Sequence, residues 1–251
     1  MLCWPEDSLP ERIAFISDLH LFSTRTTADE HITAMREAAE TADLVVFGGD
    51  LFDFRWSRLA DAERTAAAAI DWLADFADSA RGRQFVYLFG NHDGDPLLRR
   101  RLAEWQDSRS DFEIAGDLLR VGDTAFLHGD VIEGKNDGRD LDAYRLRWAD
   151  KPRASDVQSR VYDAAVTVRA HRLAAALAHR RRRTQLRLIR YLSHQLCGPA
   201  EGIRRVVFGH THRLCDGQWY RGTQFFNPGA AVRGVPFRPI VIPVGDSTPE
   251  S

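Results

Sequence analysis

Residues 84–93 read Gln-Phe-Val-Tyr-Leu-Phe-Gly-Asn-His-Asp, an apolar run that ends in four polar or flexible residues. The run 84–89 is short, apolar and rich in aromatic residues, which predicts a buried β-strand. The tetrapeptide Gly90-Asn91-His92-Asp93 then stands at the carboxyl end of that strand, the edge at which open α/β sheets bind ligands. Taken alone, the tetrapeptide is more typical of a turn, because Asn, Asp and Gly favour turns through their backbones.

Four further apolar runs end in the same way. They are 13–17 before Asp18-Leu19-His20, 44–47 before Gly48-Gly49-Asp50-Leu51-Phe52-Asp53, 125–127 before His128-Gly129-Asp130, and 206–208 before Gly209-His210-Thr211-His212. Five unrelated turns with this composition are a poorer explanation than one site shared by five strands. In a strand, residues two apart point to the same face, so we expect Asp18 and His20 to be aimed together.

The side chains gathered in this way are carboxylates, an amide and imidazoles, without a thiolate. This set suits borderline divalent ions such as manganese, iron or zinc. A magnesium site would use fewer histidines. The sequence therefore predicts a metal site at the ends of the strands.

The same motifs resemble, in order, the signature of the calcineurin-like metallophosphoesterases. They are Asp18-x-His20, Gly49-Asp50-x-x-Asp53, Gly90-Asn91-His92-Asp93, His128 and Gly209-His210-x-His212, and they span most of the chain. The resemblance implies an α/β fold with four layers, in which two mixed sheets pack face to face between helices. It also implies an enzyme that hydrolyses a phosphoester or pyrophosphate bond with two divalent metal ions.

The resemblance gives each motif residue an expected role. One ion is expected on Asp18, His20, Asp50 and His212, and the other on Asp50, Asn91, His128 and His210, so that Asp50 bridges them. Manganese is the expected metal, with iron or zinc as alternatives, and no organic cofactor is expected. We expect His92 to face the scissile phosphate, where it stabilises charge or protonates the leaving oxygen. Asp93 is expected to orient His92, and Asp53 to support a metal ligand.

The remaining pattern predicts a single domain over residues 1–251. Helices are expected at 27–42, 58–80 and 96–107, and late strands at 217–226 and 238–244. The alternation of strands and helices in the first part of the chain indicates an α/β fold. The strand-rich later part agrees with a second sheet.

A helical insertion is predicted at approximately 135–200. Between residues 139 and 195 the chain has 14 Lys and Arg against 5 Asp and Glu, so this segment carries +9 and the rest carries −11. The segment includes four consecutive arginines at 180–183 and an apolar stripe, which consists of Leu186, Ile189, Leu192 and Leu196. A packed helical hairpin with a solvated basic face and a cap for an anionic or amphiphilic substrate both explain this pattern.

Motif order, length and the insertion also resemble the UDP-2,3-diacylglucosamine hydrolases. Those enzymes cut a nucleotide–sugar–lipid pyrophosphate at the membrane surface under a helical cap. The resemblance implies a lipid-linked, anionic phosphate substrate and peripheral membrane contact through the basic insertion. That group typically has Arg where this chain has His92. A phosphodiesterase or phosphatase for nucleotides, nucleic acid or phosphoproteins therefore stays open, as does a non-enzymatic scaffold, which would be expected to lack ligands that this chain has.

Composition is ordinary for a soluble globular protein, with 44% hydrophobic and 28% charged residues and a net charge of −2. The bulk charge gives no indication of a nucleic-acid partner. Cys3, Cys197 and Cys215 form no paired motif, which favours reduced thiols and a cytoplasmic location, with the inner face of the membrane as a second possibility. We see no signal peptide and no apolar run near the ~20 residues of a membrane helix.

Overall fold

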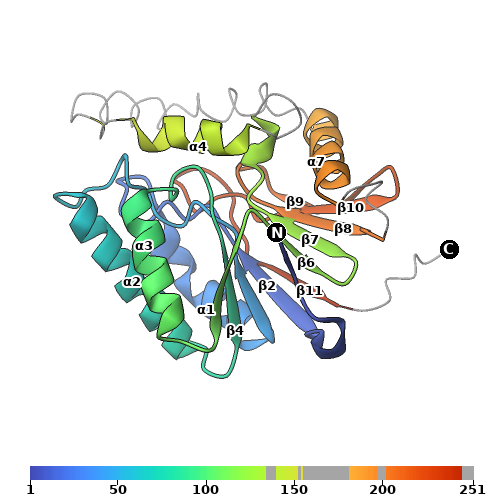
Figure 1. Cartoon of the computed structure of the whole chain (residues 1–251), viewed down its shortest axis with the longest axis horizontal. Coiled ribbons are helices and arrows are strands. Elements are labelled where there is room, and N and C mark those ends of the chain that lie inside the picture. Colours follow the sequence, from blue (N-terminus) through green and yellow to red (C-terminus); the bar gives the residue numbers. More distant parts are fainter. Residues whose placement is uncertain (134–139, 152–153, 155–180, 197–201, 245–251) are drawn as a thin grey trace.

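The computed structural model describes residues 1–133, 140–151, 154, 181–196 and 202–244. In this part of the chain, two mixed β-sheets pack face to face with helices on their outer faces (Figure 1). This arrangement confirms the predicted α/β sandwich of four layers.

The first sheet has five strands in the order β11-β2-β3-β4-β5. Their bounds are β2 (Arg12–Ile16), β3 (Leu44–Phe47), β4 (Gln84–Leu88), β5 (Phe112–Gly116) and β11 (Ile240–Pro243). β2 to β5 are parallel, and β11 joins the edge of β2 antiparallel. Since parallel strands end at the same edge, the motifs that follow β2, β3 and β4 are brought together there.

The second sheet has six strands in the order β1-β6-β7-β8-β10-β9. Their bounds are β1 (Leu2–Cys3), β6 (Leu118–Val121), β7 (Thr124–Leu127), β8 (Arg205–Phe208), β9 (Cys215–Tyr220) and β10 (Thr223–Asn227). The neighbours β7 and β8 are parallel, so the histidine motifs that follow them also lie at one edge.

The prediction of a single strand over 217–226 is wrong, because β9 and β10 form a hairpin. The chain reverses at Arg221 and Gly222, whose φ angles are 51° and 77°. Two consecutive residues with positive φ are typical of the tight turns that join antiparallel strands. Arg is not a usual residue at such a turn, so the residues at 221–222 do not predict a hairpin here.

The central strands are apolar on both faces because each one separates two cores. Along β2, Ile13 and Phe15 face the other sheet, whereas Ala14 and Ile16 face the helices. The rings of Phe15 and Phe126 meet between the sheets, with centroids 6.1 Å apart. Burial on both faces explains why these strands appear in the sequence as unbroken apolar runs.

Three helices cover the outer face of the first sheet. They are α1 (Ile32–Glu40), α2 (Ala62–Ser79) and α3 (Pro96–Asp107), all within the predicted ranges, and short 3₁₀ turns lie at η1 (Glu6–Ser8), η2 (Ala28–His31) and η3 (Asp130–Ile132). The Asp61 carboxylate accepts the Arg64 N–H at the start of α2, and the Asp95 carboxylate accepts the Leu97 N–H at the start of α3. These acceptors satisfy backbone donors that a helix leaves unpaired at its first turn.

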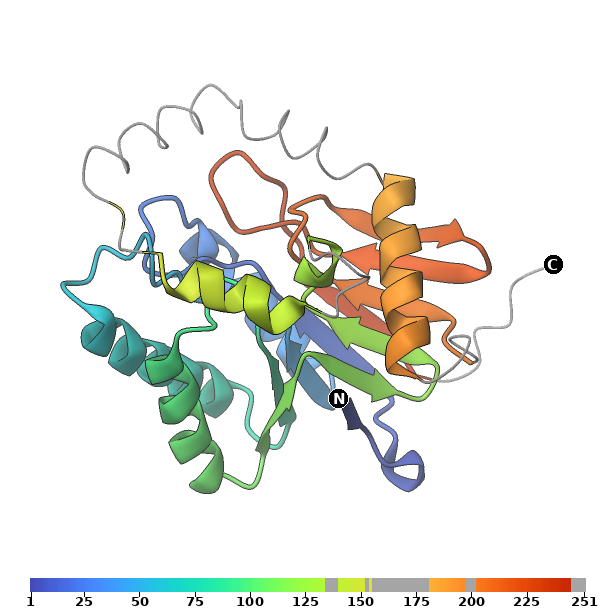
Figure 2. The ribbon, with the colours of Figure 1, turned by 45° about the horizontal axis from the view of Figure 1, so that its top comes forward.

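Two helices of the predicted insertion lie in the described part of the chain, namely α4 (Leu141–Ala149) and α7 (Arg181–Gln195). The region between them, 155–180, falls outside the described residues, so the full extent of the insertion stays a prediction. In Figures 1 and 2, α4 lies across the end of the sandwich, and α7 lies beside the second sheet on the same side of the molecule.

The apolar stripe of α7 belongs to the fold rather than to a free surface. Leu192 is buried in the core beneath the second sheet, and Ile189 and Leu196 pack against that core. Only Leu186, which is half-buried, lies outside it. Most of the stripe is therefore not available to contact an amphiphilic substrate. No described helix is long and apolar enough to cross a membrane.

Candidate metal centre

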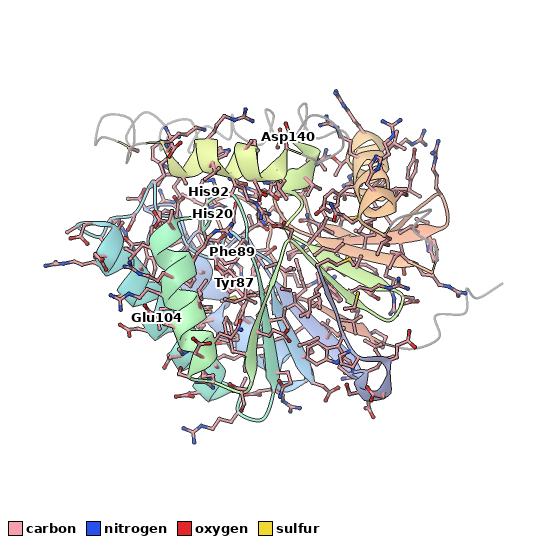
Figure 3. The ribbon with its side chains drawn as sticks, viewed as in Figure 1. His20, Tyr87, Phe89, His92, Glu104 and Asp140 are labelled. Atoms are coloured by element: carbon pink, nitrogen blue, oxygen red, sulfur yellow. The ribbon has the colours of Figure 1, made fainter. Side chains whose placement is uncertain are left out.

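The predicted ligands come together beneath α4 from the ends of five strands. In the described residues, three groups of three side chains have ligand atoms within 4.8 Å of one another: Asp18, His20 and His212; Asp50, His128 and His210; and His20, Asp53 and His92. The first two contain only predicted ligands. These two groups correspond to the two expected ion sites. Figure 3 shows His20 and His92 directly beneath α4.

In the first group, two imidazoles and a carboxylate converge. The Nε2 atoms of His20 and His212 are 3.1 Å apart, and Nε2 of His212 is 3.3 Å from Oδ1 of Asp18. Asp18 is fully buried. A buried carboxylate facing two imidazole nitrogens is a suitable set of ligands for a borderline divalent ion.

Two predicted ligands of the second ion have buried atoms without a hydrogen-bond partner. Nδ1 of His128 lies 2.9 Å from the Gly48 carbonyl, which can only accept, so Nδ1 carries a proton and Nε2 is the nitrogen that faces the site. That Nε2 lies 3.3 Å from Oδ2 of Asp50. Nε2 of His128 and Oδ1 of Asn91 are both buried without a hydrogen-bond partner. Since buried polar atoms are normally satisfied, these two atoms fit a bound cation.

Five of the candidate ligands have left-handed backbones. Their φ angles are 56° at Asp18, 47° at His20, 52° at Asp50, 64° at His210 and 53° at His212. Such conformations cost roughly 1–3 kcal/mol each in residues other than glycine and gather at functional sites. They also correct our geometric argument for Asp18-x-His20: both residues lie beyond the end of β2, and a left-handed turn rather than a strand face aims them together.

Two glycines are required by close approach of the backbone to the carboxylates. A Cβ atom at Gly90 would overlap the Asp50 carboxylate, and one at Gly209 would overlap that of Asp18. Backbone groups instead hold these acids: the His92 N–H donates to Oδ1 of Asp50 at 2.7 Å, and the His210 N–H donates to Oδ1 of Asp18 at 2.9 Å. The position of both carboxylates thus depends on two glycines, which leave room for them because they have no side chain.

A model of the calcineurin-like phosphoesterase family matches residues 11–214, a range that includes every candidate ligand. The chain belongs to the calcineurin-like phosphoesterase family. It is a metal-dependent hydrolase of phosphoesters, and the family implies two divalent ions. A dimetal phosphatase from Danio rerio has a similar solved structure over 93% of this chain and 92% of its own, with 12% identity and a TM-score of 0.47. No curated protein sequence matches the chain significantly.

His92 of this phosphoesterase lies between the candidate ligands and α4. Its Nδ1 is 3.3 Å from Oδ1 of Asp53, an ion-pair distance without hydrogen-bond geometry. Burial alone would lower the pKa of His92, but the carboxylates of Asp53 and Asp50 outweigh it and raise the pKa to about 9. His92 is therefore a cation at neutral pH, which suits a neighbour of a phosphate group.

Asp53, rather than Asp93, contacts the His92 ring. Its other oxygen lies 3.6 Å from Nδ1 of His20, so one carboxylate supports both rings. Asp93 faces the other way: it accepts the Tyr87 hydroxyl at 2.7 Å, the Gly90 N–H at 2.7 Å and the Leu51 N–H at 3.0 Å. The expectation that Asp93 orients His92 directly is thus corrected. Asp93 fixes the two loops that carry Asp50 and His92.

The buried Arg145 of α4 is a residue that sequence reasoning missed. Its guanidinium donates to both oxygens of Asp130, at 2.7 and 2.9 Å, and to the Phe89 carbonyl at 2.7 Å, and it also pairs with Asp117. Only 4% of its side chain is exposed. Asp130 follows His128 closely, and Phe89 precedes Gly90. Arg145 therefore ties α4 to two loops of the metal centre.

Two other residues support the loop that carries His210, and the motifs gave no sign of them. The Asn227 side chain donates to the Gly209 carbonyl at 2.8 Å and accepts the Gly229 N–H at 2.9 Å. Oε1 of Glu133 lies 3.4 Å from Nε2 of His210. Carboxylate and amide partners of this kind hold the orientation of a ligand.

Replacing Arg145 with Met will destabilise the protein by about 3–5 kcal/mol, because the buried carboxylate of Asp130 loses its partner. Chemical denaturation measures this change. The matched control is Arg147→Met, which alters an exposed arginine on the same helix and should stay within ±0.5 kcal/mol. Equal stability of the two variants would show that the Arg145 contacts contribute nothing to folding.

Proposed function

We propose that this phosphoesterase hydrolyses the pyrophosphate bond of a lipid-linked nucleotide sugar, a substrate similar to UDP-2,3-diacylglucosamine, at the inner face of a membrane. The observation that carries the proposal is the position of α4. This helix lies over the candidate metal centre, and the Trp148 ring centroid is 4.9 Å from that of His92. A covered centre of this kind suits a substrate whose leaving group extends beyond the phosphate.

The chemistry follows from the residues around the phosphate position. Two divalent ions, with manganese as our proposal, would be held by Asp18, His20, Asp50, Asn91, His128, His210 and His212, and would polarise the phosphate and activate water. His92 is placed to stabilise the charge of the phosphoryl oxygens or to give its proton to the leaving oxygen. Asp53 holds His92 in its protonated form. Asp93 keeps the Gly90 loop in place.

A basic surface on α7 supports the membrane part of the proposal. Arg181, Arg182, Arg183 and Arg190 are exposed. Trp219 of β9, 58% exposed, lines the same surface hollow as Arg181 and Arg182. Arginine beside an exposed indole is typical of a surface that meets anionic lipid headgroups.

Replacing Arg181, Arg182, Arg183 and Arg190 with Gln should weaken binding to anionic lipid vesicles by roughly 10²–10³-fold, given about 1 kcal/mol for each arginine. Arg187 is left intact because it donates to the Ile132 carbonyl. Cleavage of a lipid-linked pyrophosphate should slow, whereas cleavage of bis(p-nitrophenyl) phosphate should not change. Vesicle sedimentation and steady-state kinetics measure these effects.

The control replaces four exposed arginines elsewhere, Arg12, Arg64, Arg81 and Arg100, with Gln. It removes the same charge and should leave vesicle binding near the wild-type level. If both variants lose vesicle binding equally, only net charge matters and the α7 surface is not specific. If both substrates slow equally in the α7 variant, the helix is structural.

A second candidate is a phosphodiesterase or phosphatase that acts on nucleotides, nucleic acid or phosphoproteins. It is favoured by His92, because the UDP-2,3-diacylglucosamine hydrolases typically have Arg at this position. Selective loss of nucleic-acid cleavage in the α7 variant would favour it over the lipid-linked substrate.

A further inference from the structure

A pocket adjoins the candidate metal centre on the side of α4. It contains about 610 Å³ of empty space, part of it open to solvent. Asn91 and His92 form the wall that it shares with the metal centre, and Arg55, Trp148 and Lys151 lie on its other sides. A molecule whose phosphate occupied the metal centre would therefore extend into this pocket.

Two cations of the pocket lie over one aromatic ring. Nζ of Lys151 is 3.4 Å from the centroid of the Trp148 ring, and the guanidinium carbon of Arg55 is 5.8 Å from the same centroid. The Arg55 guanidinium also lies 5.2 Å from the centroid of Trp56. The indoles thus hold both side chains at the pocket by cation–π contact.

Within the described residues, neither cation is neutralised by an acid. The contacts of their charged groups there are with the indole rings, and the Nε atom of Arg55 is buried without a hydrogen-bond partner. Partial burial and the neighbouring Arg55 lower the pKa of Lys151, as expected for two like charges that face each other. The pocket therefore presents positive charge and unused hydrogen-bond donors.

The pocket also contains one carboxylate. Asp95 lines it, and its Oδ1 accepts the Leu97 N–H at 2.8 Å, at the first turn of α3. The single negative charge of Asp95 is outnumbered by Arg55 and Lys151, so the pocket keeps a net positive charge and favours an anion.

We infer that this pocket binds a second anionic group of the substrate, the phosphoryl group bonded to the phosphate under attack, and that Arg55 and Lys151 determine specificity for phosphoanhydrides. This inference rests on the proposed function, since it places the first phosphate at the metal centre. A diester with one phosphorus atom has no group for the pocket. A phosphoanhydride has one phosphate for the metal centre and a second for the pocket. The second phosphate offsets the repulsion between Arg55 and Lys151.

Binding of phosphonates to the metal-loaded protein tests the inference by calorimetry. Methylenediphosphonate serves as a pyrophosphate analogue, and methylphosphonate as its counterpart with a single phosphorus atom. The double variant Arg55→Gln, Lys151→Gln should bind methylenediphosphonate roughly 10–100-fold more weakly, the range for lost hydrogen bonds between charged groups. Its affinity for methylphosphonate and its rate on bis(p-nitrophenyl) phosphate should not change.

The matched control is the double variant Arg58→Gln, Arg147→Gln, which alters exposed arginines on the loop of Arg55 and on α4, the helix before Lys151, both outside the pocket lining. It should bind both phosphonates like the wild type. Metal content measured beside each titration shows whether the diphosphonate has removed ions.

The outcomes separate this inference from the proposed function. Unchanged binding of methylenediphosphonate in the pocket variant, or equal weakening of both phosphonates, would overturn the second anion site. If the wild type cleaved no phosphoester but the pocket variant still lost diphosphonate affinity selectively, the proposed function would fail and the anion site would stand.

Discussion

Replacing Asp50 with Asn will remove both divalent ions from the protein, whereas His20→Ala and His128→Ala will each remove one. Asp50 is the one residue expected to bind both ions, and its carboxylate lies 3.3 Å from Nε2 of His128. Asparagine keeps an oxygen that can accept the His92 N–H, so the loop contact at 2.7 Å can persist. The lost charge should therefore act on metal binding rather than on the loop.

Metal analysis of the dialysed variants, together with titration calorimetry, measures this result. Asp71→Asn is the control, because it makes the same chemical change at an exposed position of α2. We expect the Asp50 variant to have no measurable hydrolysis, since the polarisation of the phosphate by the ions is lost. Retention of two ions per chain by Asp50→Asn would exclude Asp50 as the bridging ligand.

Replacing His92 with Ala will leave both ions in place but lower kcat by roughly 10²–10⁴-fold, the range for a positioned acid or charge-stabilising group. His92 faces Asp53 through Nδ1, and although it forms a third group with His20 and Asp53, it is not one of the predicted ligands. Its cationic side chain is expected to contribute most in the transition state, where charge builds on the phosphoryl oxygens. KM should therefore change less than kcat.

Asp53→Asn tests how His92 acts. This variant should lower kcat by about 10–100-fold, because it removes the partner that holds the ring and its proton. His194→Ala, at an exposed position of α7, is the control for loss of an imidazole. A His92→Ala variant that lost its metal would instead make His92 a ligand, and a fully active one would remove it from the mechanism.

Local pattern predicts the α/β class and the convergence of the ligands, whereas the four layers were expected only from the family resemblance. A strand with two apolar faces, such as 84–89, implies cores on both sides. A polar motif at its carboxyl end implies a shared edge with its neighbours. The left-handed backbones of Asp18 and His20 were beyond this reasoning, since nothing in their identities requires φ near 50°.

The partner of His92 was assigned to the wrong carboxylate for a related reason. Asp53 and Asp93 both belong to motifs, and adjacency in sequence favoured Asp93. The fold places the Asp93 carboxylate against Tyr87 and the Gly90 backbone, so that only the more distant Asp53 reaches the ring. The side chains of adjacent residues often point in different directions, and the backbone conformation of the turn decides which direction each takes.

The insertion was the least predictable part. Its charge indicates a solvated basic surface. Because arginines are rarely buried, the sequence does not predict that Arg145 is buried. Its partners, the Asp130 carboxylate and the Phe89 carbonyl, lie outside the helix and have no local signature. The periodicity of α7 identified an apolar face correctly but could not say that Leu192 faces a sheet rather than a ligand.

The pairing of β11 with β2 has a consequence for biosynthesis. The antiparallel neighbour of residues 12–16, which is 240–243, is made more than 220 residues after them. Until then β2, which positions Asp18 and His20, has an exposed edge and two apolar faces, a combination that favours aggregation. The high contact order of this pair also slows folding. The nascent chain is therefore expected to need protection by a chaperone until β11 is released.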